Sequence, residues 1–108
     1  MKKTISNDKI FLLDDKLKYQ KDAIVSKEIL NKKSGTITLF AFDKNQSLSE
    51  HTAPFDAFIY VVDGSVDITI ARETNTLKKG QMIIIPANKP HSLKAIARFR
   101  MLLVMIRS

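Results

Sequence analysis

With 108 residues, 27% of them charged and 44% hydrophobic, the chain has the length and composition of one globular domain, residues 1–108, with a single core. Its net charge of +7 comes from basic pairs and single residues without any helix-turn-helix, zinc-knuckle or aromatic RNA-binding pattern, so we expect no nucleic-acid partner. The lack of cysteine excludes disulfides, cysteine-ligated zinc and thiol chemistry, and it fits a reducing compartment such as the cytoplasm.

The first part of the chain gives weak structural signals. Residues 1–9 are polar and are expected to be loosely ordered, and residues 9–13 have the composition of a short edge strand. Residues 14–22 carry alternating charges around Leu17 and Tyr19, a pattern that does not distinguish helix from loop. The apolar residues here are too few for the core of a signal peptide.

The rest of the chain consists of short segments rich in β-branched and aromatic residues, separated by turn signals. Residues 57–62 are apolar throughout, as in a strand covered on both faces, whereas residues 65–70 alternate between apolar and polar. Between them, Asp63-Gly64 predicts a hairpin, because glycine accepts the positive φ of tight turns. The strands predicted in this way are 23–30, 36–42, 57–62, 65–70, 76–77, 82–85, 91–95 and 99–106.

Two connections complete this description. Residues 43–47 are expected to form a loop that leads to the first histidine, and residues 72–75 a turn. No segment has a sustained helical period, so the pattern predicts an all-β fold, an antiparallel barrel or jelly roll. The longest apolar run, residues 101–106, is far shorter than a membrane span, and we therefore expect a soluble protein without a membrane partner.

Alternation also predicts which side chains share a face. In the segment 36–42 the shared face is formed by Ile37, Leu39 and Ala41. In the last strand the apolar residues fall into two sets on opposite faces: Phe99, Met101, Leu103 and Met105 in one, and Leu102, Val104 and Ile106 in the other.

The two histidines of the chain, His51 and His91, are 40 positions apart. His51 precedes a strongly apolar strand, and His91 opens the strand that follows a turn containing Pro86 and Pro90. We expect the two imidazoles to meet inside the closed sheet. The alternative for each histidine is a purely structural role, with hydrogen bonds to backbone or water.

Both segments resemble the motifs of the cupin superfamily. Residues 51–64 follow the spacing of the first motif, G-x5-H-x-H-x3/4-E-x6-G, with HTAP where cupins often have HTHP. Residues 80–95 follow that of the second, G-x5-P-x-G-x2-H-x3-N, with Asn88 and Ala95 as departures. The resemblance implies a small single-domain cupin, a double-stranded β-helix or jelly-roll barrel.

In cupins, two histidines and a glutamate of the first motif and the histidine of the second bind a divalent metal inside the barrel. By this resemblance His51 and His91 take two ligand positions for Zn, Ni, Mn or Fe, whereas Ala53 and Ala57 stand at the other two and cannot coordinate. Two imidazoles without a carboxylate bind a metal weakly. Asp56, next to the missing glutamate, is a third candidate, although strand alternation directs it outward.

Three functions follow as hypotheses. In the first, the barrel binds a small molecule in a cavity lined by Ile59, Val61, Leu93 and Met101, with His51 and His91 at its polar end. In the second, the resemblance implies a divalent-metal-dependent isomerase, dioxygenase or decarboxylase that acts on a small metabolite, with no catalytic residue assigned. In the third, the protein is a homodimer that pairs through an outer sheet face formed by Phe58, Tyr60, Val62, Leu102, Val104 and Ile106.

Overall fold

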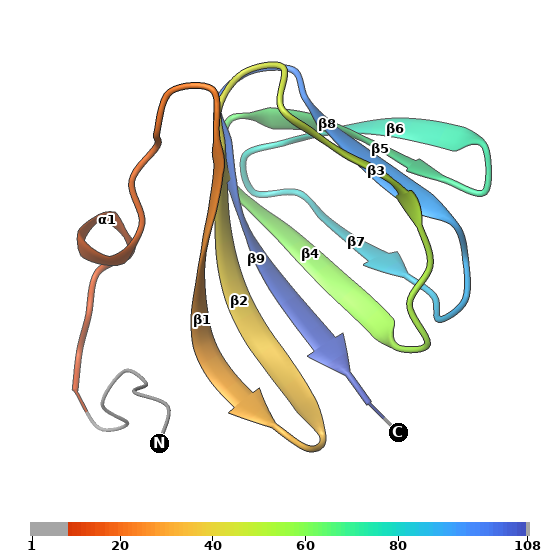
Figure 1. The fold of residues 1–108 in the computed structure, drawn as a ribbon, viewed down its shortest axis with the longest axis horizontal. Helices are drawn as coiled ribbons and strands as arrows, with labels where there is room; N and C mark the ends of the chain where they lie inside the picture. Colours follow the sequence, from red (N-terminus) through yellow and green to blue (C-terminus); the bar gives the residue numbers. More distant parts are fainter. Residues whose placement is uncertain (1–8, 108) are drawn as a thin grey trace.

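The structure is a computed structural model and describes residues 9–107, most of which lie in two antiparallel β-sheets (Figure 1). The elements are α1 (Leu13–Lys16), β1 (Ile24–Lys32), β2 (Gly35–Phe42), β3 (Ser47–His51), β4 (Asp56–Asp63), β5 (Ser65–Ile70), β6 (Glu73–Lys78), β7 (Met82–Ile85), β8 (His91–Ala95) and β9 (Phe99–Ile106). The larger sheet has the order β1-β2-β9-β4-β7 and the smaller one β3-β8-β5-β6. The predicted all-β antiparallel fold is confirmed.

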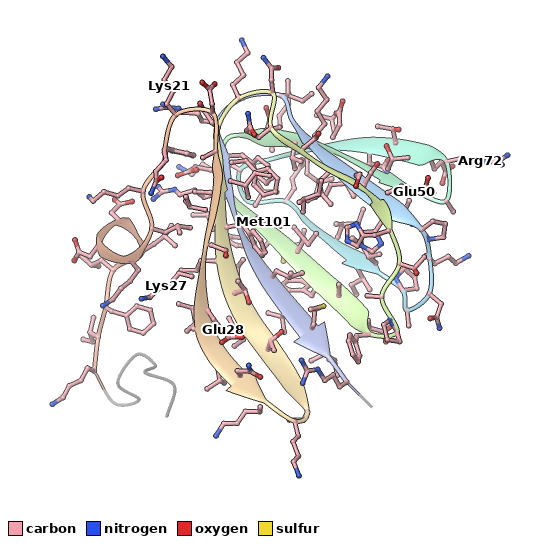
Figure 2. The ribbon with its side chains drawn as sticks, in the orientation of Figure 1. Lys21, Lys27, Glu28, Glu50, Arg72 and Met101 are labelled. Carbon is pink, nitrogen blue, oxygen red and sulfur yellow. The ribbon has the colours of Figure 1, made fainter. Side chains whose placement is uncertain are left out.

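The inner faces of the two sheets share one hydrophobic core. Its most buried aromatic pair is Phe42 of β2 and Phe99 of β9, whose rings stack with centroids 4.5 Å apart. Further along β9, Met101 is directed between the sheets (Figure 2), where it belongs to the same core as Ile68 of β5. The predicted inner face of the last strand is therefore confirmed.

Three local predictions are wrong or incomplete. Residues 9–13 form no strand, and α1 begins at Leu13 instead. Residues 72–75 are not a turn, because Ala71 and Arg72 make the reversal at positive φ and β6 begins at Glu73. The strand β3 was not predicted, since its residues are mainly polar. The expectation of loose order at residues 1–9 falls almost wholly outside the described residues.

Gly64 connects the two sheets. The predicted hairpin at Asp63-Gly64 is wrong, because β4 belongs to the larger sheet and β5 to the smaller one. Gly64 has φ +83°, and a Cβ atom added to it would stand 1.9 Å from the carbonyl oxygen of Arg98. The close approach of the Arg98 backbone therefore requires glycine at this crossing.

The N-terminal segment, residues 13–23, covers part of the outer face of the larger sheet. Leu39 and Ala41 share one face of β2, as predicted, and that face is the outer one. They pack against Leu17 and Tyr19 in a second, smaller apolar cluster. No helix among residues 9–107 is long and apolar enough to cross a membrane.

Arg100 of β9 fixes this segment to the sheet. Its Nε donates to Asp63 Oδ2 at 3.0 Å, its Nη2 donates to the same oxygen, and its Nη1 donates to Asp14 at 2.6 Å. The hydroxyl of Tyr19 donates to Asp63 Oδ1 at 2.6 Å. Burial alone would raise the pKa of Asp63, but the hydrogen bonds from Arg100 and Tyr19 outweigh burial and hold it below its ordinary value. Burial, helped by Asp63, raises the pKa of Tyr19 to about 12.

Candidate functional site

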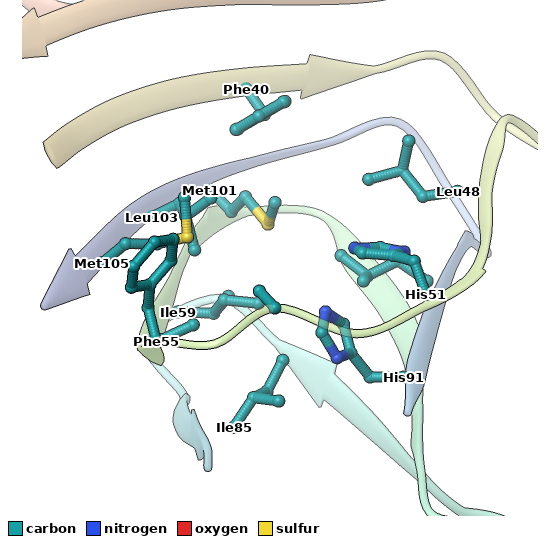
Figure 3. A pocket seen from close by; sticks show the side chains of 13 residues that line it. Phe40, Leu48, His51, Phe55, Ile59, Ile85, His91, Met101, Leu103 and Met105 are labelled. Carbon is teal, nitrogen blue, oxygen red and sulfur yellow. The ribbon is translucent and has the colours of Figure 1, made fainter. Parts of the chain in front are cut away.

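His51 and His91 lie directly opposite each other on neighbouring strands. His51 ends β3, His91 begins β8, and the register pairs the two residues. Their ring centroids are 4.3 Å apart with an angle of 62° between the ring planes, an edge-to-face arrangement (Figure 3). His91 is buried and His51 is exposed. The two imidazoles that the sequence predicted to meet therefore do so.

Each imidazole is held by the carbonyl group two residues before it. His51 Nδ1 is 2.7 Å from the oxygen of Ser49, and His91 Nδ1 is 2.9 Å from the oxygen of Lys89. Because a carbonyl oxygen only accepts, Nδ1 carries the hydrogen in both rings. A ring that is neutral and bonded in this way has its lone pair on Nε2.

A cavity of about 200 Å³ opens beside the histidine pair. Apart from the two imidazoles, its walls are apolar, with side chains directed into the hollow from both sheets (Figure 3). The other lining residues are Phe40, Leu48, Ala53, Phe55, Ala57, Ile59, Ile85, Leu93, Met101, Leu103 and Met105. The two alanines at the motif positions thus form part of an apolar wall.

Of the four apolar residues predicted to line the cavity, Ile59, Leu93 and Met101 do so, and Val61 does not. Val61 lies two residues beyond Ile59 on β4, where it is completely buried in the packed core. Phe55 also lines the cavity, and strand alternation could not place it there, because a loop residue has no alternation pattern that shows its direction.

The side chains present do not fit a three- or four-ligand metal centre. Asp56, the candidate third ligand, is exposed, and its Oδ1 accepts a hydrogen bond from the peptide N–H of Ala87 at 2.9 Å. Within residues 9–107, no three His, Cys, Asp or Glu side chains come together in a group that could hold a metal ion. Since two neutral imidazoles are a weak donor set, the ligand positions occupied by Ala53 and Ala57 remain without a substitute.

The turn before His91 joins the two motif segments. Asn88 has φ 67°, a left-handed conformation that asparagine tolerates better than most residues, which explains how it replaces the motif glycine. Its peptide N–H donates to the carbonyl oxygen of Ala53 at 2.8 Å. Backbone contacts therefore join the two segments on both sides of the histidines: Asn88 with Ala53 on one side, and Leu48 with Leu93 on the other.

Both motif segments, which the pairing of His51 with His91 brings together, lie within the range of one protein-family model. A family model described as a cupin domain matches residues 38–106, which include both histidines. The chain belongs to the cupin family. No curated protein matches this cupin significantly.

Solved structures give the same result. A protein of unknown function from Streptococcus pyogenes is 33% identical, with a TM-score of 0.91 over 98% of this chain and 93% of that one. A cupin 2 conserved barrel domain protein from Leptotrichia buccalis is 35% identical, with a TM-score of 0.86 over 90% of this chain and 47% of that one. A cupin superfamily protein from Desulfitobacterium hafniense, 22% identical over 98% of this chain and 97% of that one, shares the fold with a TM-score of 0.89.

Proposed function

We propose that this cupin binds a small, mainly apolar molecule in its cavity, with a polar group of the guest bonded to Nε2 of His51 and His91. The observation that carries the proposal is the pairing of two imidazoles, each with Nδ1 bonded to the backbone, at the wall of an otherwise apolar cavity. Binding sites for small molecules generally combine apolar walls with a few converging polar groups.

The histidine pair suits two kinds of polar group. When both rings are neutral, their Nε2 atoms accept hydrogen bonds, for example from a hydroxyl group of the guest. When a ring is protonated, Nε2 becomes a donor and favours an anionic group. The site therefore recognises a guest by one polar end while the apolar walls enclose its body.

The metal-dependent enzyme is the weaker candidate. Its support is that metal-binding histidines commonly donate Nδ1–H to a backbone carbonyl, as both histidines do here. Against it stands the donor set, because Asp56 is engaged by the peptide group of Ala87 and both remaining motif positions are alanine. The contacts favour small-molecule binding without a metal.

Replacement of His91 by alanine is expected to weaken binding of the guest by about tenfold or more, because one Nε2 bond is lost. The measurement is a thermal-shift screen of a metabolite library, followed by calorimetric titration of each compound that raises the melting temperature. Glu50→Ala is the matched control, since Glu50 is exposed next to His51 on the same strand. A library without any stabilising compound, or guests that bind His91→Ala as tightly as the wild type, would contradict the proposal.

We further propose that two copies pair through the outer face of the larger sheet beside β7. Exposed Met82, Ile84 and Ile106 lie there, and the register places Ile84, Phe58 and Val104 in one row across three strands. An apolar row of this kind is typical of interaction surfaces. The part of the predicted patch contributed by Leu102 does not belong to it, because the N-terminal segment packs against Leu102.

Ile84→Lys is expected to convert the dimer into a monomer, because a charge at the centre of a desolvated apolar interface has no partner. Light scattering coupled to size-exclusion chromatography measures the mass. Ile96→Lys is the control, since Ile96 is also exposed but lies after β8, outside this face. A wild-type protein that is monomeric at micromolar concentration would rule out the interface.

A further inference from the structure

The polar side chains of the cavity wall are confined to the histidine pair. Of the 13 residues that line the cavity, only His51 and His91 carry polar side chains, and none carries a carboxylate, ammonium or guanidinium group (Figure 3). A polar group of the guest away from the imidazoles would lose its water without gaining a side-chain partner, which costs free energy. The wall therefore fits a guest with one polar end and an uncharged, apolar body.

The size of the cavity limits the guest further. Its volume is about 200 Å³. An apolar cavity of about 150 Å³ engineered into another protein takes up a benzene molecule. By this comparison the cavity is large enough for one six-membered ring with one or two small substituents, whereas a nucleotide or a disaccharide is too large.

The side chains that face the body of the guest are suited to an aromatic ring. Two phenylalanines and two methionines line the cavity: Phe40, Phe55, Met101 and Met105. Phe55 and Met105 lie at the end of the hollow opposite the two histidines (Figure 3). Phenyl groups pack edge-to-face or offset against another ring, and methionine sulfur makes favourable contacts with ring edges. A saturated guest of the same size gains neither kind of contact, so the wall favours an aromatic guest.

The cavity borders solvent along the connection between β3 and β4. In this segment every second residue, His51, Ala53 and Phe55, lines the cavity. Each of the three also reaches solvent, since His51 is exposed and the other two are half-buried. These residues therefore form the rim at which a small guest meets the cavity.

We infer that the guest is a monocyclic phenol, whose ring lies among the phenylalanine and methionine side chains and whose hydroxyl group reaches the histidine pair. This inference rests on the proposed binding function and names the class of guest. A phenolic hydroxyl donates a hydrogen bond to Nε2 of a neutral imidazole. The hydroxyl group thus pairs with the one polar part of the wall, and the ring fills the apolar part.

The test compares three probes of similar size by calorimetric titration into the wild-type protein: 4-methylphenol, toluene and 4-methylcyclohexanol. Toluene lacks the hydroxyl group, whereas 4-methylcyclohexanol keeps it but lacks the aromatic ring. We expect 4-methylphenol to bind about tenfold more tightly than either, because each of the others loses one of the two kinds of contact. This comparison needs no variant, so a folding defect cannot obscure it.

Phe55→Leu separates contacts with the ring from burial alone. Leucine keeps an apolar side chain at the end of the cavity but removes the phenyl group. We therefore expect the preference for 4-methylphenol over 4-methylcyclohexanol to fall by about threefold or more, while 4-methylcyclohexanol binds as before. Phe11→Leu is the matched control, because Phe11 is 40% exposed and does not line the cavity. In His91→Ala the preference for 4-methylphenol over toluene is expected to fall, since the hydroxyl group loses an acceptor.

Each outcome bears on either the class of guest or the binding function itself. If toluene or 4-methylcyclohexanol binds as tightly as 4-methylphenol, or if Phe55→Leu leaves the aromatic preference intact, the inference is overturned, whereas library compounds that bind through His91 still uphold the proposed function. Failure of 4-methylphenol to bind when such compounds do bind also overturns it. If neither the probes nor any library compound binds, the proposed function is wrong.

Discussion

Gly64→Ala is expected to destabilise the protein by more than about 3 kcal/mol, because the added methyl group strains the backbone and also overpacks it. At φ +83° an L-residue is strained, and its Cβ would lie 1.9 Å from the Arg98 oxygen and 2.6 Å from Phe99 Cα. Neither contact is with a flexible side chain, so relief requires the two sheets to shift where they join. Urea denaturation followed by circular dichroism measures the loss.

Gly80→Ala separates the two causes of that loss. Gly80 has φ +86°, close to the value at Gly64, but an added Cβ there would meet nothing within 4 Å. We therefore expect a cost of only about 1–2 kcal/mol, the conformational part alone. Equal losses for the two variants would show that the contact with Arg98 does not constrain the crossing between the sheets.

Arg100→Met is expected to cost about 3 kcal/mol in the free energy of unfolding, because it leaves the half-buried carboxylate of Asp63 without its cation. The Arg100 side chain is 14% exposed and bonds Asp63, Asp14 and the oxygen of Leu17. Methionine keeps much of the apolar volume, so the loss reports on the charge and its hydrogen bonds. The same urea titration gives the value, and limited proteolysis tests whether residues 13–23 come away from the sheet.

Arg98→Met is the matched control for Arg100→Met. Arg98 stacks on the same ring of Tyr19, at 5.2 Å against 5.5 Å for Arg100, and it also pairs with an aspartate, Asp43. The Arg98 side chain is 54% exposed. The Asp43 side chain is only 12% exposed, less than that of Asp63, but without Arg98 it keeps hydrogen bonds from two peptide N–H groups, a pair that Asp63 lacks. We therefore expect a loss below about 1 kcal/mol. Similar losses for both arginines would contradict the role assigned to the network around Asp63.

The strands that could be predicted from the sequence are those whose own residues carry the pattern. The predicted ranges 65–70, 82–85 and 99–106 agree with β5, β7 and β9. By contrast, β3 is made of polar residues and exists because β8 offers it hydrogen bonds, a cause outside its own sequence. The chain does turn at Gly64, as predicted. However, β5 joins the smaller sheet because it pairs with β6 and β8, and β8 is far from it in the sequence.

The site was predictable to a similar degree. The spacing of two motifs pointed to the meeting of His51 and His91, and alternation placed Ile59 and Met101 at the cavity. Where the hollow ends depends on how tightly the sheets pack, so the exclusion of Val61 was not predictable.

The two histidines lie on strands that differ in how many neighbouring strands they pair with. β3 is the outermost strand of the smaller sheet, and its register with β8 shifts between Leu48 and His51. β8, in contrast, is flanked by strands on both sides. An outermost strand can separate from its single neighbour while the remaining ladder stays intact. Local opening of β3 would therefore displace His51, whereas His91 would stay held between two strands.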